Sequence, residues 1–302
     1  LKESFSYLES KSISATSMSL KTSLILAALC LLIHKVSTAN QTYNRLKEFF
    51  TWKTLDFDFP DEATRTSAIQ SGAHVKGNSL ILGVEKWKDK LFVTTPRSWK
   101  SGVPSTLNYV NLKNSKPNSS PNLIPYPNYA LNNIHSPNGP NTNGTNKIIS
   151  VFRINVDVCD RLWMIDTGLA DIRGEKKVIS TPRIIIIDLT TDRIIKEHVI
   201  AKEAIVEKSF FANILVDASR NNCDRSFAYI PDLGGFQLIV YDLKKDETYK
   251  VNHHYFYFDP ESGNYNVGGL NFQWTDGVFG VALSPVDKDG YRTLYFHPLS
   301  ST

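Results

Sequence analysis

Four polar residues at the ends of predicted strands have side chains that could bind or act on a small molecule. They are Asp166, Thr167, Asp232 and His297. A carboxylate there would pair with an ammonium group, and nearby aromatic side chains would stack on a ligand ring. His297 or one of the aspartates could also accept a proton near neutral pH. For Asp166 and Asp232, capping a turn is the alternative role.

Conventional catalytic motifs are missing from the sequence, which has no nucleophile elbow, P-loop, paired zinc motif or dinucleotide fingerprint. The pair His253-His254 precedes an aromatic run and is expected to belong to a strand. Asp287 opens a segment that begins like a calcium loop, but Pro298 stands where the bidentate glutamate should be, so a hairpin turn is expected. We therefore expect no metal and no cofactor, and the catalytic residues, if any, stay open.

The elements that must position these residues are repeated. Four segments share a basic residue, a short aromatic and β-branched run, and a closing Pro or Thr; they begin at Lys90, Arg161, Arg225 and Arg292, spaced by about 64 to 71 residues. That spacing is the length of one four-stranded blade, and such a unit must bury its faces against its neighbours. The sequence predicts an all-β fold, a β-propeller, with about four blades present.

Further strands are expected on both sides of each repeated segment. The run from Ile184 to Ile187 is continuously apolar, as in a strand covered on both faces. The strands expected before each basic residue end with the segments 82–85, 155–157, 215–217 and 282–284. The strands expected after the repeated segments are 107–112, 184–189 and 238–243. A closed ring of six blades would need about 400 residues at this spacing, more than the 302 present. We expect an incomplete propeller.

The N-terminal segment is expected to stand apart from the fold. Residues 1–17 precede the first methionine and are expected to be a translated leader. Residues 18–39 have a lysine, an apolar run and a small-residue site ending at Ala39, the three parts of a secretory signal. A membrane anchor is the alternative, although the apolar run is short of the roughly 20 residues that span a bilayer. The propeller domain is then expected over 40–302.

Cysteines and sequons fit a secreted protein. Two cysteines remain after the signal, Cys159 and Cys223, and both precede an Asp-Arg pair, so they occupy the same place in adjacent repeats. An even count predicts a disulfide, with two free thiols as the alternative. Glycosylation sequons begin at Asn40, Asn118 and Asn143. The last two fall in a stretch rich in Asn, Pro and Gly, and we expect a low-complexity surface loop over 113–146.

The charge pattern of the sequence argues against a nucleic-acid partner. The formal net charge of the chain is +4, and no basic stripe of the kind that binds nucleic acid is present. We expect no nucleic-acid and no membrane partner, and the oligomeric state is left open.

Several motifs together resemble the yellow and major royal jelly protein family of insects. The matching segments are 91–97 (LFVTTPR), 102–107 (GVPSTL), 123–127 (LIPYP), 159–168 (CDRLWMIDTG), 229–232 (YIPD), 266–269 (NVGG) and 279–285 (FGVALSP). The resemblance implies a secreted six-bladed propeller with a ligand cavity at its central channel, and a disulfide that fits Cys159 and Cys223. It also implies a second cysteine pair and two more blades, which this sequence does not contain.

Three functions follow as hypotheses. The resemblance favours a secreted protein that binds or converts catechol or indole metabolites, such as biogenic amines or dopachrome, in pigmentation or melanin formation. A non-catalytic amine-binding, structural or nutritive protein is the second. The third is a calcium-dependent lactonase of propeller type, which would use inward side chains such as Glu85, Asn213 and Asp276. The expected partner is a small aromatic amine or a catechol or indole ligand.

Overall fold

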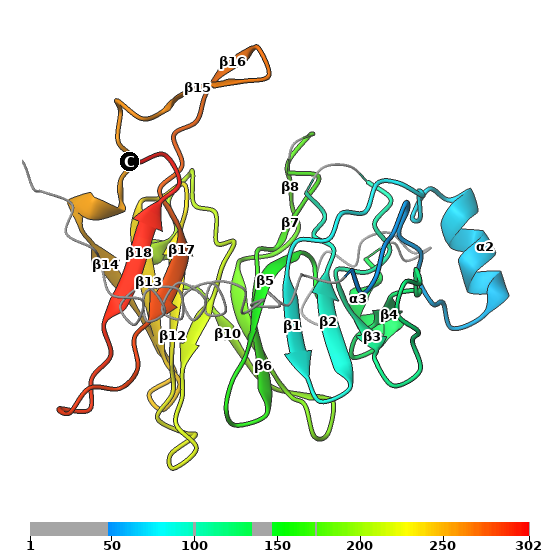
Figure 1. Cartoon of the computed structure of the whole chain (residues 1–302), viewed down its shortest axis with the longest axis horizontal. Coiled ribbons are helices and arrows are strands. Elements are labelled where there is room, and N and C mark those ends of the chain that lie inside the picture. The colour runs from blue at the N-terminus through cyan, green and yellow to red at the C-terminus, as the bar shows by residue number, and fades with distance from the viewer. Residues whose placement is uncertain (1–47, 99–100, 135–146, 173, 302) are drawn as a thin grey trace, which may run out of the picture. The chain divides into compact units, whose positions relative to one another are not determined.

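A computed structural model shows three four-stranded antiparallel sheets that follow one another along the chain, together with three two-stranded sheets among the described residues (Figure 1). The structure describes residues 48–98, 101–134, 147–172 and 174–301, all within the unit that begins at Glu48. The expected leader and signal, 1–39, and the sequons at Asn40 and Asn143 lie outside the described residues.

Each four-stranded sheet is built from strands that pair in chain order. The first sheet contains β1 (Val84–Trp87), β2 (Lys90–Thr94), β3 (Leu107–Asn111) and β4 (Ile124–Pro125). The second contains β5 (Val151–Val156), β6 (Arg161–Asp166), β9 (Arg183–Asp188) and β10 (Arg193–Val199). The third contains β11 (Leu215–Asp217), β12 (Phe227–Asp232), β13 (Gln237–Asp242) and β14 (Glu247–Asn252). Smaller pairs are β7 (Leu169–Ala170) with β8 (Lys177–Val178), β15 (Asn264–Val267) with β16 (Leu270–Gln273), and β17 (Val278–Leu283) with β18 (Leu294–Pro298).

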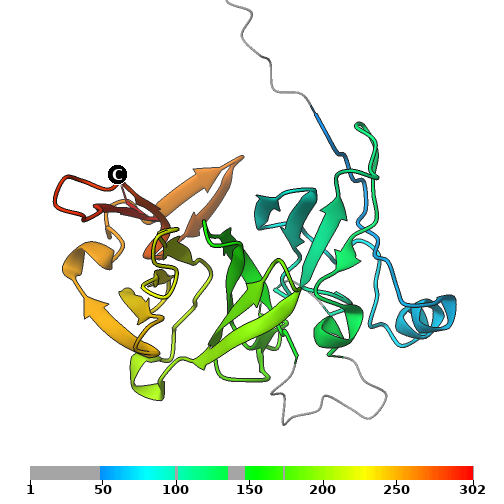
Figure 2. The same ribbon diagram turned by 90° about the horizontal axis from the view of Figure 1, so that it is seen from below.

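The first strands of successive sheets contact one another. β1 contacts β5, β5 contacts β11, and β11 contacts β17. Figure 2 shows the same succession of sheets from a second direction. First strands that meet while the later strands extend outward are typical of propeller blades. The predicted all-β propeller architecture is confirmed, with three complete blades and a two-stranded part of a fourth among the described residues.

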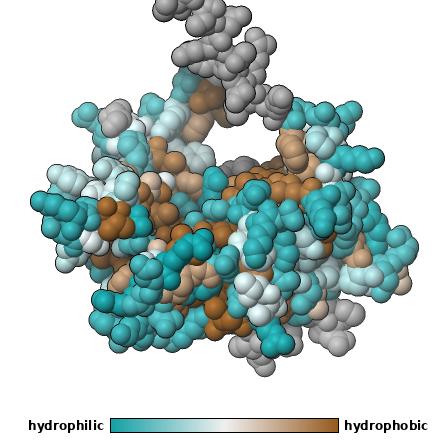
Figure 3. Space-filling view, turned by 60° about the horizontal axis from the view of Figure 1, so that its bottom comes forward, coloured by the Kyte–Doolittle hydropathy of each residue, from teal (hydrophilic) through white to brown (hydrophobic). Residues whose placement is uncertain are grey.

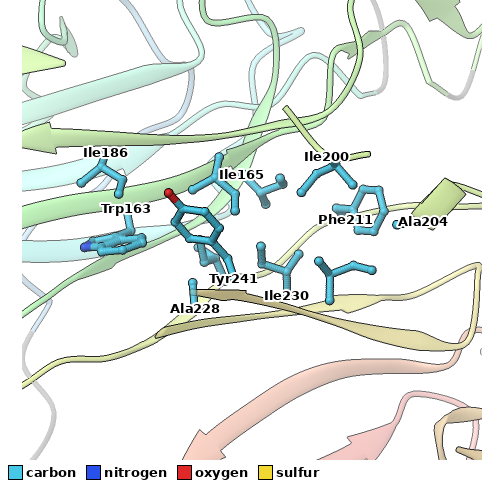
Figure 4. Close-up of a cluster of buried hydrophobic side chains, with 12 residues drawn as sticks. Trp163, Ile165, Ile186, Ile200, Ala204, Phe211, Ala228, Ile230 and Tyr241 are labelled. Carbon is cyan, nitrogen blue, oxygen red and sulfur yellow. The ribbon is translucent and has the colours of Figure 1, made fainter. Parts of the chain in front are cut away.

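Two hydrophobic cores lie on opposite faces of the second sheet. Side chains alternate across a strand, so Ile184 and Ile186 of β9 pack into one core while Ile185 and Ile187 pack into the other. The first core also contains Trp163 of β6 and Tyr241 of β13, and it joins the second and third sheets (Figure 4). The second core joins the first and second sheets. The continuous apolar run is therefore explained by burial on both faces, as expected.

The segment 113–146 differs from the surface loop expected there, as far as it is described. It supplies β4, the outermost strand of the first sheet, and Leu123 and Tyr126 are fully buried. Asn132 is also fully buried, and its side-chain oxygen accepts hydrogen bonds from the backbone N–H groups of Thr106 and Leu107. The few apolar residues of this Asn- and Pro-rich stretch thus close the first blade. Residues 135–146 lie outside the described part.

Helices are few among the described residues. They are α2 (Glu62–Gln70), α3 (Tyr129–Asn132) and the short 3-10 helices η1 (Lys202–Ala204) and η2 (His254–Phe256). Asp61 caps α2, because its carboxylate accepts a hydrogen bond from the Thr64 N–H at 2.7 Å. Within the described ranges, no helix has the length and apolar character to cross a membrane.

An ion cluster at the β13–β14 turn predicts acid sensitivity. Asp246 accepts hydrogen bonds from Lys196, His198 and Tyr241, and the Lys196 ammonium is the main cause that lowers the pKa of Asp246 to about 2 from 3.8. A lowered folded-state pKa stabilises the fold above pH 3.8, and this contribution is lost as the pH falls from 3.8 to about 2.

We expect Asp246→Asn to lower the thermal midpoint at pH 6, and to lower it much less at pH 3, where the wild-type carboxylate is becoming protonated. The carboxylate is about half exposed, so solvent screening limits the effect to roughly 1–3 °C. Calorimetry of both proteins at the two pH values measures it. An equal difference at pH 6 and pH 3 would contradict this role of Asp246.

Candidate functional site

The first strands of the four blades line a pocket of about 330 Å³. Its polar side chains are Glu85 of β1, Arg153 and Asn155 of β5, and Asn213, which lies just before β11. Phe279 of β17 adds an aromatic wall. Figure 3 shows hydrophobic surface along the lower margin of an opening, with hydrophilic surface at the periphery. Polar side chains that converge beside apolar surface in a concave site are a usual feature of small-molecule pockets.

Glu85 is the acidic group of this pocket. Partial burial raises its pKa, while a hydrogen bond of 3.3 Å from the Asn155 side-chain amide opposes that rise. The carboxylate makes no ion pair with another described residue. Glu85 can therefore accept hydrogen bonds from a ligand ammonium or hydroxyl group.

Backbone geometry places Arg153 and Asn155 together. They stand two residues apart on β5, so they share one face of the strand, while Ile154 between them is buried in the core. The Arg153 guanidinium carbon lies 5.5 Å from the centre of the Phe279 ring. This contact between β5 and β17 places a cation and an aromatic ring at the pocket wall.

Side-chain amides tie the first strands to one another. The Asn155 oxygen accepts a hydrogen bond from the Val216 N–H at 2.9 Å, and the Asn213 amide donates to the Phe279 carbonyl at 2.8 Å. Each bond links two different blades. The pocket walls are therefore held in place before any ligand binds, which lowers the entropic cost of binding.

The chain that enters β1 approaches the backbone of β5 closely, and this approach depends on Gly83. A β-carbon at this position would lie 2.4 Å from the Phe152 carbonyl oxygen and 2.6 Å from the Thr94 hydroxyl. The Gly83 N–H instead donates to that hydroxyl at 2.7 Å. The absence of a side chain thus allows the chain entering β1 to pack against β5.

Asp166, a candidate from the sequence, lies at the end of β6 and is fully buried. Its carboxylate accepts hydrogen bonds from the backbone N–H groups of Ile149, Ser150 and Gly168 at 2.9 to 3.1 Å. Arg183 lies 3.4 Å away. These contacts fasten the chain that leads into β5, which is the role of a structural cap.

Asp232 occupies the matching position at the end of β12 and is also fully buried. It accepts hydrogen bonds from the Ser209 hydroxyl, the Phe210 and Gly235 N–H groups and the Gln237 side chain, at 2.6 to 2.9 Å. Asp166 and Asp232 thus have the same role in successive blades, since each carboxylate accepts hydrogen bonds from nearby backbone N–H groups. β6 and β12 are the second strands of their sheets, and the first strands β5 and β11 are the ones that line the pocket.

Thr167 and His297 are placed apart from this pocket as well. Thr167 is buried, and its hydroxyl donates to the Ser150 carbonyl at 3.1 Å. It contributes to a separate cleft of about 310 Å³, whose mostly apolar wall includes Leu169, Ile205 and Phe211. His297 is exposed on β18. The structure therefore does not bring the four sequence candidates together in one cavity.

Two of the three residues named for the lactonase hypothesis, Glu85 and Asn213, do line the inner pocket. Asp276 does not; the Trp274 indole donates to its carboxylate outside the pocket. Across the described ranges, no group of three or more His, Cys, Asp or Glu side chains is arranged to hold a metal ion.

Arg153, Asn155 and Phe279 were not singled out from the sequence as site residues. A signal for the first two exists, because Arg-Ile-Asn alternates polar and apolar residues in an otherwise apolar first strand. Phe279 carries no such signal, since an aromatic residue in a strand is normally a core residue.

The disulfide is present between Cys159 and Cys223, whose α-carbons are 6.0 Å apart. It joins the turn before β6 to the turn before β12, so it links the second and third blades. Asn118, the sequon residue within the described ranges, is exposed in the turn between β3 and β4.

Comparison with known proteins gives the relationships of the chain. The major royal jelly protein family model matches residues 149–302. "Protein yellow" of Drosophila erecta is 41% identical over 85% of this chain and 46% of its own length, and that of Drosophila yakuba is 41% identical over 89% and 48%. Among solved structures, apo AztD from Citrobacter koseri has a TM-score of 0.21 and 11% identity over 65% of this chain and 50% of its own, a likeness too low to bear on the argument.

The chain spans about half the length of these curated relatives. Both the family model and the relatives cover the second and third blades, with the disulfide and the strands that hold Asp166 and Asp232. The identities extend over most of this chain, so the resemblance found in its motifs is confirmed. The chain belongs to the yellow and major royal jelly protein family.

Proposed function

We propose that this chain is a secreted yellow-like protein that binds small catechol or indole metabolites in the pocket formed by the first strands of its blades. The observation that carries the proposal is the pocket itself, which combines the Glu85 carboxylate, two side-chain amides and the Phe279 ring within about 330 Å³. A role in pigmentation or a related extracellular process is part of the proposal, supported by the relatives named "Protein yellow".

The chemistry of the pocket matches this ligand class. A protonated amine would pair with Glu85, and the hydroxyl groups of a catechol or the ring N–H of an indole would bond to the amides of Asn155 and Asn213. The ligand ring would pack against Phe279 and the apolar wall.

Conversion of the bound molecule is the second candidate, and Glu85 favours it. Dopachrome isomerisation requires a base that takes a proton near neutral pH, and Glu85 is the carboxylate of this pocket, with a pKa that partial burial raises. The carboxylate would have to reach the proton within hydrogen-bond distance. A dopachrome turnover assay beside a binding titration separates conversion from binding alone.

Secretion is supported by the N-terminal segment, the disulfide and a glycosylation sequon. The 18–39 segment has the pattern of a secretory signal, and a disulfide persists in oxidising compartments. The exposed Asn118 is an accessible glycan acceptor. Mass spectrometry of the protein secreted from insect cells, before and after glycosidase treatment, tests both features.

Glu85→Gln is expected to weaken the binding of dopamine and serotonin by roughly ten- to a hundredfold, because a charge-assisted hydrogen bond contributes about 1.5–3 kcal/mol. Isothermal titration calorimetry of the full chain measures the effect. Glu261→Gln, at an exposed site outside the pocket, is the matched control and should bind like the wild type. Wild-type protein that binds no aromatic ligand, or unchanged binding in Glu85→Gln, would refute the proposed site.

A further inference from the structure

Arg153 has unused hydrogen-bonding capacity at the wall of the inner pocket. Its Nε is buried and has no hydrogen-bond partner in the described part of the chain. The side chain also makes no ion pair with a described residue; its recorded contact is the packing of the guanidinium over Phe279. A buried donor without a partner is costly, by the free energy of removing it from water.

Two buried arginines of this chain, Arg97 and Arg161, instead donate hydrogen bonds from all three of their guanidinium nitrogens. Arg97 donates to five backbone carbonyls. Arg161 donates to the Asp157 carboxylate at 2.7 Å and to the Ser226 hydroxyl at 2.7 Å. Acceptors within the chain therefore bind the guanidinium groups of Arg97 and Arg161. The Nε of Arg153 has no such acceptor in the described part of the chain and lies at the pocket wall, which indicates that a bound ligand supplies it.

The pocket therefore holds two opposite charges that do not neutralise each other. Glu85 is bonded to Asn155 instead of Arg153, and both charged side chains line the same cavity. The guanidinium carbon lies 5.5 Å from the centre of the Phe279 ring, and the Nε–H group remains for a partner. The guanidinium edge that bears this group matches a carboxylate, because two parallel N–H groups bind two oxygens at once.

We infer that Arg153 determines specificity, selecting ligands that carry a carboxylate beside their amino or ring N–H group. The ligand class is then aromatic amino acids and carboxylated indoles, in preference to the corresponding decarboxylated amines. This inference rests on the proposed function, since it assigns a ligand class to the same pocket. The carboxylate would bind Arg153, the amino group would bind Glu85, and the ring would lie on the apolar wall.

Ligand pairs that differ only in the carboxylate test the inference. We expect wild-type protein to bind L-DOPA at least tenfold more tightly than dopamine, and tryptophan at least tenfold more tightly than tryptamine, by isothermal titration calorimetry. Arg153→Met keeps an unbranched side chain against Phe279 but removes the charge. It should abolish the preference, and amine binding should be unchanged or tighter because a cation is removed.

Two further variants complete the test. Arg153→Lys keeps the charge without the planar fork and should retain only part of the preference. Arg193→Met, at an exposed arginine of β10, should behave like the wild type. If Arg153→Met does not fold, as judged by its thermal transition, the wild-type ligand pairs and Arg153→Lys still decide the question.

The outcomes separate the two proposals. Equal wild-type affinity for both members of each pair, or a preference that survives in Arg153→Met, would overturn the assignment of Arg153 while leaving the binding site standing. Failure of all four ligands to bind would overturn the proposed function, and the assignment of Arg153 with it.

Discussion

Arg97→Met is expected to lower the free energy of unfolding by about 3–5 kcal/mol, the cost of disrupting a buried, fully bonded charge. Arg97 is buried between the first blade and the chain entering the second, and it donates to the carbonyls of Val103, Pro104, Asn132, Ile148 and Ile149. Methionine fills a similar volume but leaves five buried carbonyls without these donors.

Burial lowers the pKa of Arg97 to about 10, so the guanidinium is still charged at neutral pH. Arg97→Lys would keep a charge but could not donate to all five carbonyls, so we expect a loss of similar direction and somewhat smaller size. Urea denaturation followed by tryptophan fluorescence measures both variants. Arg225→Met, at an exposed arginine, is the control, and an equal small loss in all three proteins would show that the Arg97 contacts contribute little.

Removing the disulfide has the second large expected effect. The bond closes a sequence separation of 64 residues, and replacing Cys159 and Cys223 by serine is expected to lower the free energy of unfolding by about 4 kcal/mol, through the larger entropy of the unfolded chain. Both cysteines lie in turns outside the hydrophobic cores, so the substitutions leave packing intact.

Chemical reduction provides the control for this effect. Adding a reductant should destabilise the wild type by the same amount and leave the double serine variant unchanged, when urea unfolding is compared with and without reductant. Destabilisation of the serine variant by reductant, or a wild-type protein indifferent to it, would contradict the assignment.

The blade pattern could be predicted from the sequence because it depends on local chemistry that repeats. The apolar run at 184–189 was placed within one residue of β9, since only burial on both faces explains four consecutive isoleucines. The segment 113–134 could not be predicted in this way. Its outer strand β4 is two residues long, and its contribution to the core comes from single side chains, Leu123 and Tyr126.

The helix α2 was not expected, because one residue of it, Ala68, is buried and the segment shows no apolar period. Its start depends on the Asp61 cap, a local feature that many turns share.

The candidate site was predictable only in part. The sequence identifies Asp166 and Asp232 as acids at strand ends, but it cannot show that backbone N–H groups take up their oxygens. Nor does it show which strand of each sheet is innermost, and that order decides which residues line the pocket. Glu85 and Asn213 were named as inward side chains of the lactonase hypothesis, whereas Arg153 becomes notable only once its neighbours are known to leave it unpaired.

The alternation of β9 between two cores has an evolutionary consequence. Ile184 and Ile186 face the third blade, while Ile185 and Ile187 face the first, so a volume change at one residue can be compensated by a neighbour on one side without disturbing the other. Adjacent codons would then drift independently, and codons two apart would covary with the same neighbouring blade. Across relatives, substitutions in this strand should therefore fall into two interleaved sets, each tracking its own neighbouring sheet.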